Sequence, residues 1–371
     1  KIIISAVILA IVIWGGVKLF GTKNEKTNEP IKIGAVLALT GNNASYGQST
    51  KKGMDLAIEE LNKGGKNINI VYEDDKSSND GVVSAFQKIL TIDKVPVALG
   101  FVSSGGVLAA SSVANSSKVV LLSTLASADE IKDAGDYVFR IKESSAIHGK
   151  EMAKYAKNVL GFNKVALYYA NAANGISYAN SFKKEFINMG GNIVFDGKYI
   201  EKSNDFRSDL LKIKAVGPEA IYIAGVAPDM AQILVQANEL GVKTIWLASS
   251  GAESPKLIEI AKSIAEGLIF TTPAFNPNQA NDLVQKFTEA YKQKYNELPD
   301  FIVANGYDGI MVIYDVMEKY GYDSEKIKNG LYATKNHHGV GGTFSFDEFG
   351  EVQKPVMFKV VKNGQFVKLE E

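Results

Sequence analysis

Short apolar runs alternate with amphipathic stretches along most of this chain. From Ile31 onward, runs of strand type are separated by segments in which apolar residues recur at helical spacing, as in Gly53 to Asn62. This alternation predicts βαβ units and parallel sheets. The expected strands of a first series cover residues 31–39, 68–72, 97–101 and 119–122. After a run at 137–141, those of a second series cover 165–169, 193–195, 220–223 and 244–247. Two consecutive series predict two doubly wound lobes that face each other across a cleft.

The order changes in the last third of the chain. Residues 281–295 and 302–320 have the pattern of two long helices with no strand between them, and β-type runs follow at 343–346, 356–361 and 366–369. This order predicts that the chain crosses back between the lobes through a hinge of several strands. We therefore expect an α/β fold of two Rossmann-like lobes. Residues 31–143 plus 275–340 would form lobe 1, and residues 144–274 plus 341–371 would form lobe 2.

The N-terminal segment has a different composition. Ile2 to Phe20 is an almost unbroken apolar run led by Lys1, and its length matches the ~20 residues that cross a bilayer as a helix. Lys18 lies near the far end, where its side chain can reach the membrane interface. No small-x-small cleavage site precedes the polar stretch 21–30. This favours a membrane anchor at residues 1–20, with a removed signal sequence as the alternative. Either reading gives a linker at 21–30 and places residues 31–371 on the extracytoplasmic face.

Composition excludes several classes of function. Lys+Arg and Asp+Glu number 41 each, so no net charge attracts nucleic acid. The chain has no cysteine, which excludes disulfides, thiolate metal sites and a cysteine nucleophile. No dinucleotide-binding, P-loop, serine-hydrolase or zinc-protease motif is present. These observations favour a binding protein with no cofactor and no catalytic or metal site over an enzyme.

Candidate binding residues lie in loops after the expected strands, where ligands bind in open α/β sheets. Four such loops, at 40–47, 102–106, 123–127 and 248–251, are rich in glycine and small hydroxyl residues. Backbone N–H groups at the start of the following helices suit a carboxylate. Any single serine could be an ordinary helix cap, but four such loops together favour a site. In the first loop, Tyr46 could offer an aromatic wall or a hydroxyl group.

Two other polar pairs are interpreted as structural. His337 and His338 are adjacent and precede a glycine, which indicates a solvated loop rather than a metal site. Asp74 and Asp75 end a strand without further acidic ligands at the spacing of a cation site.

A series of short motifs resembles a known family. The matching stretches are Thr40-Gly41 followed by Tyr46-Gly47, residues 53–65, Tyr72 to Ser77, Gly100 to Ser104, Tyr137 to Arg140, Ala265-Glu266-Gly267, and Gly341 to Gly350. In this order the chain resembles the leucine/isoleucine/valine-binding group of type I periplasmic solute-binding proteins, which deliver ligands to ABC importers.

The resemblance implies which residues bind a ligand carboxylate. Ser104 falls at the carboxylate-binding serine, supported by the neighbouring Ser103 and Gly105, while Leu125 falls at a backbone contact and Ser127 at a hydroxyl contact.

The second lobe departs from the family pattern. The acidic residue that holds the ligand ammonium falls at Ser250, another often acidic position falls at Ser145, and two cleft tyrosines are replaced by Asn174 and Val226. A buried ammonium without a carboxylate would cost several kcal/mol. The pattern therefore predicts a ligand with a carboxylate and a neutral or less cationic group, such as an amide, hydroxy acid or keto acid. The alternative is that Glu253, close to Ser250 in the chain, meets the ammonium.

The leading functional prediction is hinge closure around a branched-chain amino acid or a related small carboxylate or amide, followed by docking of the closed form on an ABC permease. A membrane-tethered sensor with the same fold is the alternative. An enzyme is the third possibility, and it rests on the doubly wound pattern alone.

Overall fold

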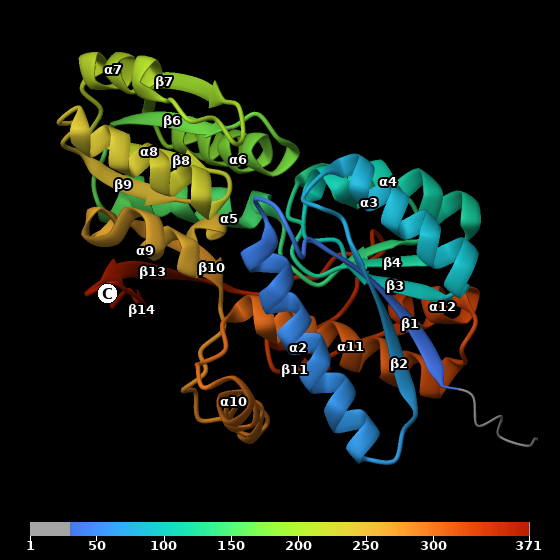
Figure 1. Ribbon diagram of the computed structural model, residues 1–371. Helices are drawn as coiled ribbons and strands as arrows, with labels where there is room; N and C mark the ends of the chain where they lie inside the picture. Colours follow the sequence, from blue (N-terminus) through green and yellow to red (C-terminus); the bar gives the residue numbers. More distant parts are fainter. Residues whose placement is uncertain (1–29, 371) are drawn as a thin grey trace, which may run out of the picture. The chain divides into compact units, whose positions relative to one another are not determined.

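The computed structural model describes residues 30–370, which contain two main sheets (Figure 1). The first sheet has five strands in the order β2 (Ile68–Asp74), β1 (Ile31–Leu37), β3 (Val97–Gly100), β4 (Val120–Ser123) and β5 (Val138–Arg140). Strand β1 pairs with β3, β3 with β4 and β4 with β5, all in parallel. Strands β3 to β5 are buried along their whole length, as expected when helices cover both faces of a parallel sheet.

Helices cover this first sheet on two sides (Figure 1). They are α2 (Ala44–Lys63), α3 (Asn79–Lys88), α4 (Ser104–Ser117), α11 (Phe301–Tyr320) and α12 (Ser324–Ala333). Helices α2 and α11 approach each other through glycines. A Cβ atom on Gly53 would lie 2.0 Å from the carbonyl oxygen of Val303, and one on Gly306 would lie 2.3 Å from that of Thr50. Only glycine allows this backbone contact, which joins the C-terminal helices to the N-terminal sheet.

The second sheet is mostly parallel. Its seven strands are, in order, β14 (Gln365–Lys368), β13 (Val356–Lys362), β10 (Ile269–Pro273), β9 (Ile245–Ala248), β8 (Ala220–Ala224), β6 (Lys164–Ala170) and β7 (Asn192–Tyr199). Strand β13 runs antiparallel to both of its neighbours. The associated helices are α5 (Ser145–Lys154), α6 (Ala173–Asn188), α7 (Arg207–Val216), α8 (Ala227–Glu239) and α9 (Pro255–Ala261). Stacking of Phe182 on Tyr222, with 4.5 Å between ring centroids, fixes α6 on this sheet.

The chain passes between the sheets after β5, after β10 toward α10 (Asp282–Tyr295), and before β13. A buried ion pair lies at two of these crossings. Arg140, at the end of β5, is fully buried and pairs with Glu351, while its Nη1 donates a 2.8 Å hydrogen bond to the carbonyl oxygen of Ala128. The two crossing segments are therefore held together by charge.

The expected fold class, two doubly wound α/β lobes joined by several segments, is confirmed. Strand β10 and helix α12 were not anticipated. The β-type run at 343–346 also has an unexpected place, because β12 (Gly342–Phe344) pairs with β11 (His337–Gly339) in a separate hairpin. This hairpin is tied to α11, since Asp308 accepts hydrogen bonds from the N–H groups of Val340 and Gly341 at 2.7 and 2.8 Å.

The two histidines of the sequence analysis lie in β11 rather than in a loop. His337 packs against the ring of Phe344, with 5.0 Å between centroids, and His338 is exposed. Asp74 accepts hydrogen bonds from the N–H groups of Leu39 and Thr40 and from the Thr40 hydroxyl, which is a structural role. Among residues 30–370, no cluster of three or more His, Asp or Glu side chains is placed to hold a metal ion.

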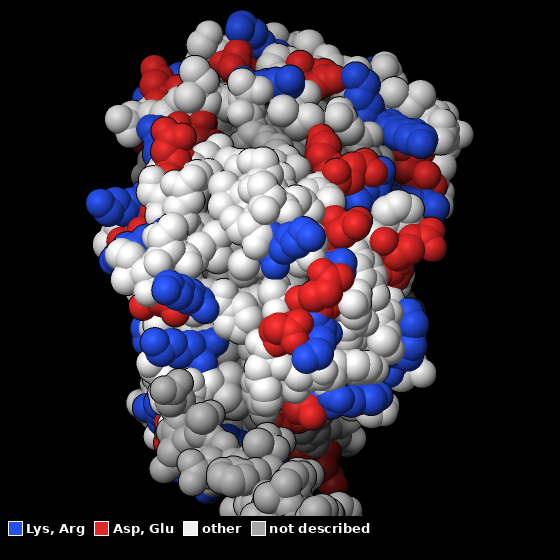
Figure 2. Space-filling model, turned by 90° about the vertical axis from the view of Figure 1, so that its right-hand side faces the viewer, with Lys and Arg blue, Asp and Glu red and all other residues white. Residues whose placement is uncertain are grey.

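The surface in Figure 2 carries basic and acidic side chains interspersed. This face has no extended basic patch of the kind that attracts nucleic acid. None of the helices within residues 30–370 has the length and apolar character needed to cross a membrane. The anchor expected at 1–20, and the linker expected at 21–30 apart from Pro30, lie outside the described residues.

Candidate ligand-binding cleft

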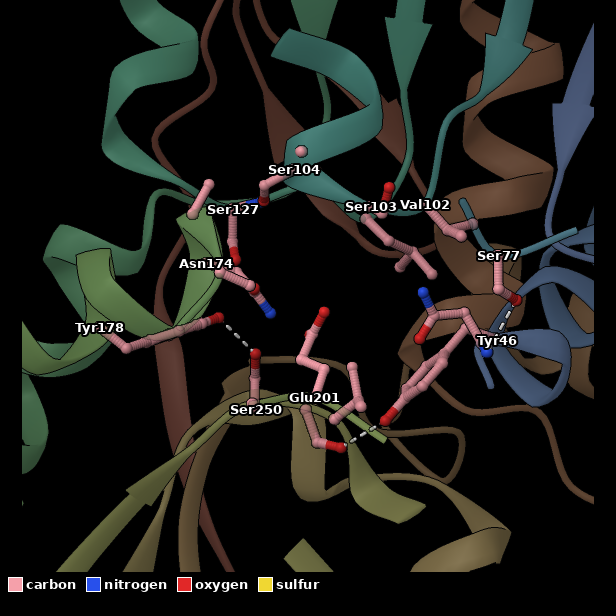
Figure 3. A pocket seen from close by; sticks show the side chains of 18 of the residues that line it. Tyr46, Ser77, Val102, Ser103, Ser104, Ser127, Asn174, Tyr178, Glu201 and Ser250 are labelled. Carbon is pink, nitrogen blue, oxygen red and sulfur yellow. Dashed lines mark hydrogen bonds between the residues drawn. The ribbon is translucent and has the colours of Figure 1, made fainter. Parts of the chain in front are cut away.

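A cavity of about 250 Å³ lies between the strand-end loops of the two sheets (Figure 3). Its walls come from loops and helix starts that follow each of the strands from β1 to β9, and from the beginning of α11. Nine of the ten residues expected from the sequence line it: Tyr46, Ser103, Ser104, Gly105, Leu125, Ser127, Asn174, Val226 and Ser250. Their roles toward a ligand stay a prediction.

The tenth expected residue, Ser145, does not line the cavity. It begins α5, and its N–H donates a 2.7 Å hydrogen bond to the carbonyl oxygen of Ser127. Its hydroxyl is fully buried against that of Ser177. Ser145 therefore joins α5 to the β4 loop and to α6 behind the cavity wall.

One end of the cavity is suited to a carboxylate. Ser104, in the first turn of α4, accepts hydrogen bonds at its Oγ from the N–H groups of Ser127 and Ala128 at 3.0 and 3.1 Å. Because these two donors fill the acceptor sites of the oxygen, the Ser104 O–H is left to donate. Ser103 caps the helix by accepting from the N–H of Gly106 at 3.1 Å. The first N–H groups of α4 have no partner within the helix and favour a negative charge.

Gly105 allows this loop to approach its neighbour. A Cβ atom at Gly105 would lie 2.8 Å from Oδ1 of Asn79, another residue of the cavity wall. The glycine therefore keeps the start of α4 open to a ligand on one side and close to α3 on the other.

Tyr46 connects the two sides of the cleft. From α2, its hydroxyl donates to the carbonyl oxygen of Gly251 at 2.7 Å and accepts from the N–H of Ala227 at 2.8 Å. Burial raises the pKa of this hydroxyl well above its usual value. A second link joins the Ser45 and Ser254 hydroxyls over 3.1 Å. These contacts describe a closed cleft, in which Tyr46 acts through its hydroxyl group and not only as an aromatic wall.

Two charged side chains in the cavity wall were missed by sequence reasoning. The first is Lys142, which follows β5 and is only 6% exposed. Its Nζ donates to Ser250 Oγ at 2.9 Å and lies 3.5 Å from the hydroxyl of Tyr178 and 5.5 Å from the ring centroid of Phe301. No carboxylate of the described chain forms an ion pair with it.

The second is Glu201, which follows β7 and extends into the cavity (Figure 3). It is partly buried, and burial raises the pKa of its carboxyl group. The charge of Asp229 adds to the rise in pKa, and Lys202 opposes it. An acidic side chain of the second lobe therefore does line the cavity, at a position other than the two considered from the sequence.

Glu253 is not the missing acid. It is 3% exposed, does not line the cavity, and its carboxylate binds Lys359 and the Thr272 hydroxyl. Both of its oxygens are used within the second sheet, so the alternative that Glu253 meets a ligand ammonium has no support in this arrangement.

The architecture and the cleft agree with comparisons to known proteins. The family model for periplasmic binding protein matches residues 30–365. The chain belongs to the periplasmic binding protein family. It is 27% identical over 353 residues to the Leu/Ile/Val-binding protein homolog 3 of Brucella melitensis. The aligned region covers 92% of this chain and 94% of that protein.

Two solved structures show the same likeness. The leucine binding protein LivK of Thermotoga maritima superposes with a TM-score of 0.87 and 30% identity, over 92% of this chain and 98% of that one. The second is the branched-chain amino acid transporter substrate binding protein LivJ of Streptococcus pneumoniae, in complex with isoleucine. It superposes with a TM-score of 0.84 and 29% identity, over 91% of this chain and 98% of that one.

The resemblance to type I periplasmic binding proteins is thus confirmed, as is the expectation of a binding protein rather than an enzyme. Membership of a periplasmic family also implies a location outside the cytoplasm.

Proposed function

We propose that this periplasmic binding protein is the solute receptor of an ABC importer and closes around a small carboxylate ligand in the cavity between its sheets. The observation that carries the proposal is the geometry of Ser104. Its Oγ already accepts two backbone hydrogen bonds, and its own proton is free to donate into the cavity. A ligand carboxylate at the start of α4 would satisfy that donor and the free N–H groups of the helix.

Closure follows from the placement of the remaining wall. Tyr46 and Ser45 belong to the first half of the cleft, and their partners Gly251, Ala227 and Ser254 belong to the second. A ligand that touches both halves binds the closed form more tightly than an open one. This difference in affinity sets how far the ligand shifts the equilibrium toward the closed form. The closed form would then dock on the permease.

The relatives support an amino acid or a similar small carboxylate as ligand. One of them has isoleucine bound, and another is described as a leucine binding protein. The apolar stretch at residues 2–20 would hold the receptor at the extracytoplasmic face of the membrane, close to its permease.

Isothermal titration calorimetry of the purified chain against amino acids and simple carboxylic acids tests the proposal. Ser104→Ala removes one charge-assisted hydrogen bond, so we expect affinity to fall about tenfold or more. Ser116→Ala is the matched control, because Ser116 lies on the same helix, exposed, with its hydroxyl on the carbonyl of Val113. Absence of binding by every compound, or equal affinities of the Ser104→Ala and Ser116→Ala variants, would contradict the proposal.

A further inference from the structure

The cavity contains a cation without a counter-charge. Lys142 Nζ has two hydroxyl neighbours, Ser250 at 2.9 Å and Tyr178 at 3.5 Å. The Tyr178 and Ser250 hydroxyls also bond to each other over 2.6 Å. An ammonium group has three donors and no acceptor, so neither the charge nor the third donor of Lys142 is satisfied by the cavity wall.

Burying an ammonium group in this way is costly unless an anion or a strong acceptor reaches it. The ring of Phe301, 5.5 Å from Nζ, offsets part of that cost. Because Lys142 is buried but lines the cavity, the group best placed to complete its surroundings is part of the ligand.

Glu201 is an anion in the same cavity that lacks an ion-pair partner within residues 30–370. Its side chain points into the space between the Ser104 loop and the second sheet (Figure 3). Ser250, which locates the Lys142 amine, lies beside Tyr178 in the same view. The wall therefore offers three polar binding positions. Ser104 can bind a carboxylate, Glu201 can bind a cation, and Lys142 can donate to a hydrogen-bond acceptor of the ligand.

Building on the proposed function, we propose that the ligand is an α-amino acid whose side chain ends in a carboxylate or carboxamide, and that Lys142 determines this specificity. The α-carboxylate binds at Ser104, the ammonium at Glu201, and a side-chain oxygen accepts from Lys142 Nζ. A branched-chain side chain would leave Lys142 buried without a partner. A dicarboxylate without an amino group would bring a second negative charge to Glu201 with nothing to neutralise it.

The test is calorimetric titration of the wild-type chain and of Lys142→Met with glutamate, aspartate, glutamine, asparagine and leucine. We expect the best of the four polar amino acids to bind the wild type at least tenfold more tightly than leucine. In Lys142→Met that affinity should fall about tenfold or more, and leucine should bind more tightly than it does to the wild type. Lys198→Met is the matched control, since Lys198 is exposed on β7 away from the cavity and forms no ion pair with any residue of the described range 30–370. Lys142→Gln replaces Lys142→Met if thermal unfolding shows that the latter does not fold.

A second arm tests the assignment of Glu201. Glu201→Gln should weaken glutamate binding while leaving or improving the binding of 2-oxoglutarate, which has no ammonium group. Wild-type binding of leucine that is tighter than that of every polar amino acid, or an equal loss for all compounds in Lys142→Met, overturns the inference. If binding in that case still depends on Ser104, the proposed function stands. Absence of binding by every compound overturns both.

Discussion

The hydroxyl group of Tyr46 donates to the carbonyl oxygen of Gly251 at 2.7 Å, which joins the N-terminal end of α2 to the loop after β9. The same oxygen accepts from the N–H of Ala227 at the start of α8. One side chain thus makes two hydrogen bonds across the cleft, and opening of the cleft would break both. It favours closure whether or not it touches the ligand.

Removal of this hydroxyl should weaken ligand binding without unfolding the protein. In Tyr46→Phe the ring remains, but the closed form loses two hydrogen bonds, each worth about 0.5–1.5 kcal/mol, and leaves a buried N–H unpaired. We expect affinity to fall about tenfold in a calorimetric titration, with little change in the melting temperature of the ligand-free protein. Tyr322→Phe, an exposed tyrosine on the first lobe, is the control. Unchanged affinity in Tyr46→Phe would show that closure does not depend on this contact.

The ion pair between Arg140 and Glu351 should contribute to stability as a pair. Arg140 is completely buried, so Glu351→Leu leaves an uncompensated guanidinium and should cost about 3–5 kcal/mol in the free energy of unfolding. The double variant Arg140→Met/Glu351→Leu removes both charges and should recover part of the loss. The midpoint of urea unfolding measures both effects. Strictly additive losses in the double variant would mean that the two side chains do not act together.

Asp308 should make stability depend on pH. Burial raises the pKa of this carboxyl to about 6, although Lys354 and the N–H groups of Gly341 and Val340 oppose the rise. The folded state therefore binds a proton more tightly than the unfolded state, whose aspartates titrate near pH 4. The stabilisation is fully present below about pH 4 and is lost as the pH rises to about 6.

Asp308→Asn removes this titration. The difference in the free energy of unfolding between wild type and variant should change by roughly 2–3 kcal/mol between pH 4 and pH 6.5, in favour of the variant at the higher pH. Chemical denaturation across this range measures the change. Asp136→Asn, an exposed carboxyl in the same lobe, is the control. A difference that stays constant with pH would mean that Asp308 does not titrate there.

The sequence predicted the two series of strands because strands covered on both faces appear as short apolar runs, as in β3 and β8. Strand β10 was not predicted because Thr271 and Thr272, within it, are polar residues, although both are fully buried. The Thr272 hydroxyl is satisfied by Glu253. Tertiary packing supplies this partner, so the pattern of apolar and polar residues along the chain does not reveal it.

The candidate site also has residues that the sequence predicted and residues that it did not. Serines and glycines after strands were predictable, because the carboxyl ends of parallel strands meet at one edge of each sheet. Lys142 and Glu201 also follow strands, but a charged residue at a strand end usually faces solvent. Only the approach of the two sheets encloses them. The position that is acidic in the family is thus Ser250 in this chain, while Glu201, an acid from a different loop, enters the same cavity.

A final prediction follows from the contact between Lys142 and Ser250. A carboxylate at position 250 would lie within reach of Lys142 Nζ, now 2.9 Å from the serine oxygen, and would neutralise it. Ser250→Asp should therefore lower the affinity for glutamate about tenfold and raise that for leucine. Ser250→Ala is the matched control, because it removes the hydroxyl without adding charge and leaves Lys142 in need of an acceptor from the ligand. Competition of the two amino acids in calorimetric titrations measures the ratio of affinities. A ratio that is equal in the Ser250→Asp and Ser250→Ala variants would mean that the charge of Lys142 does not select the side chain.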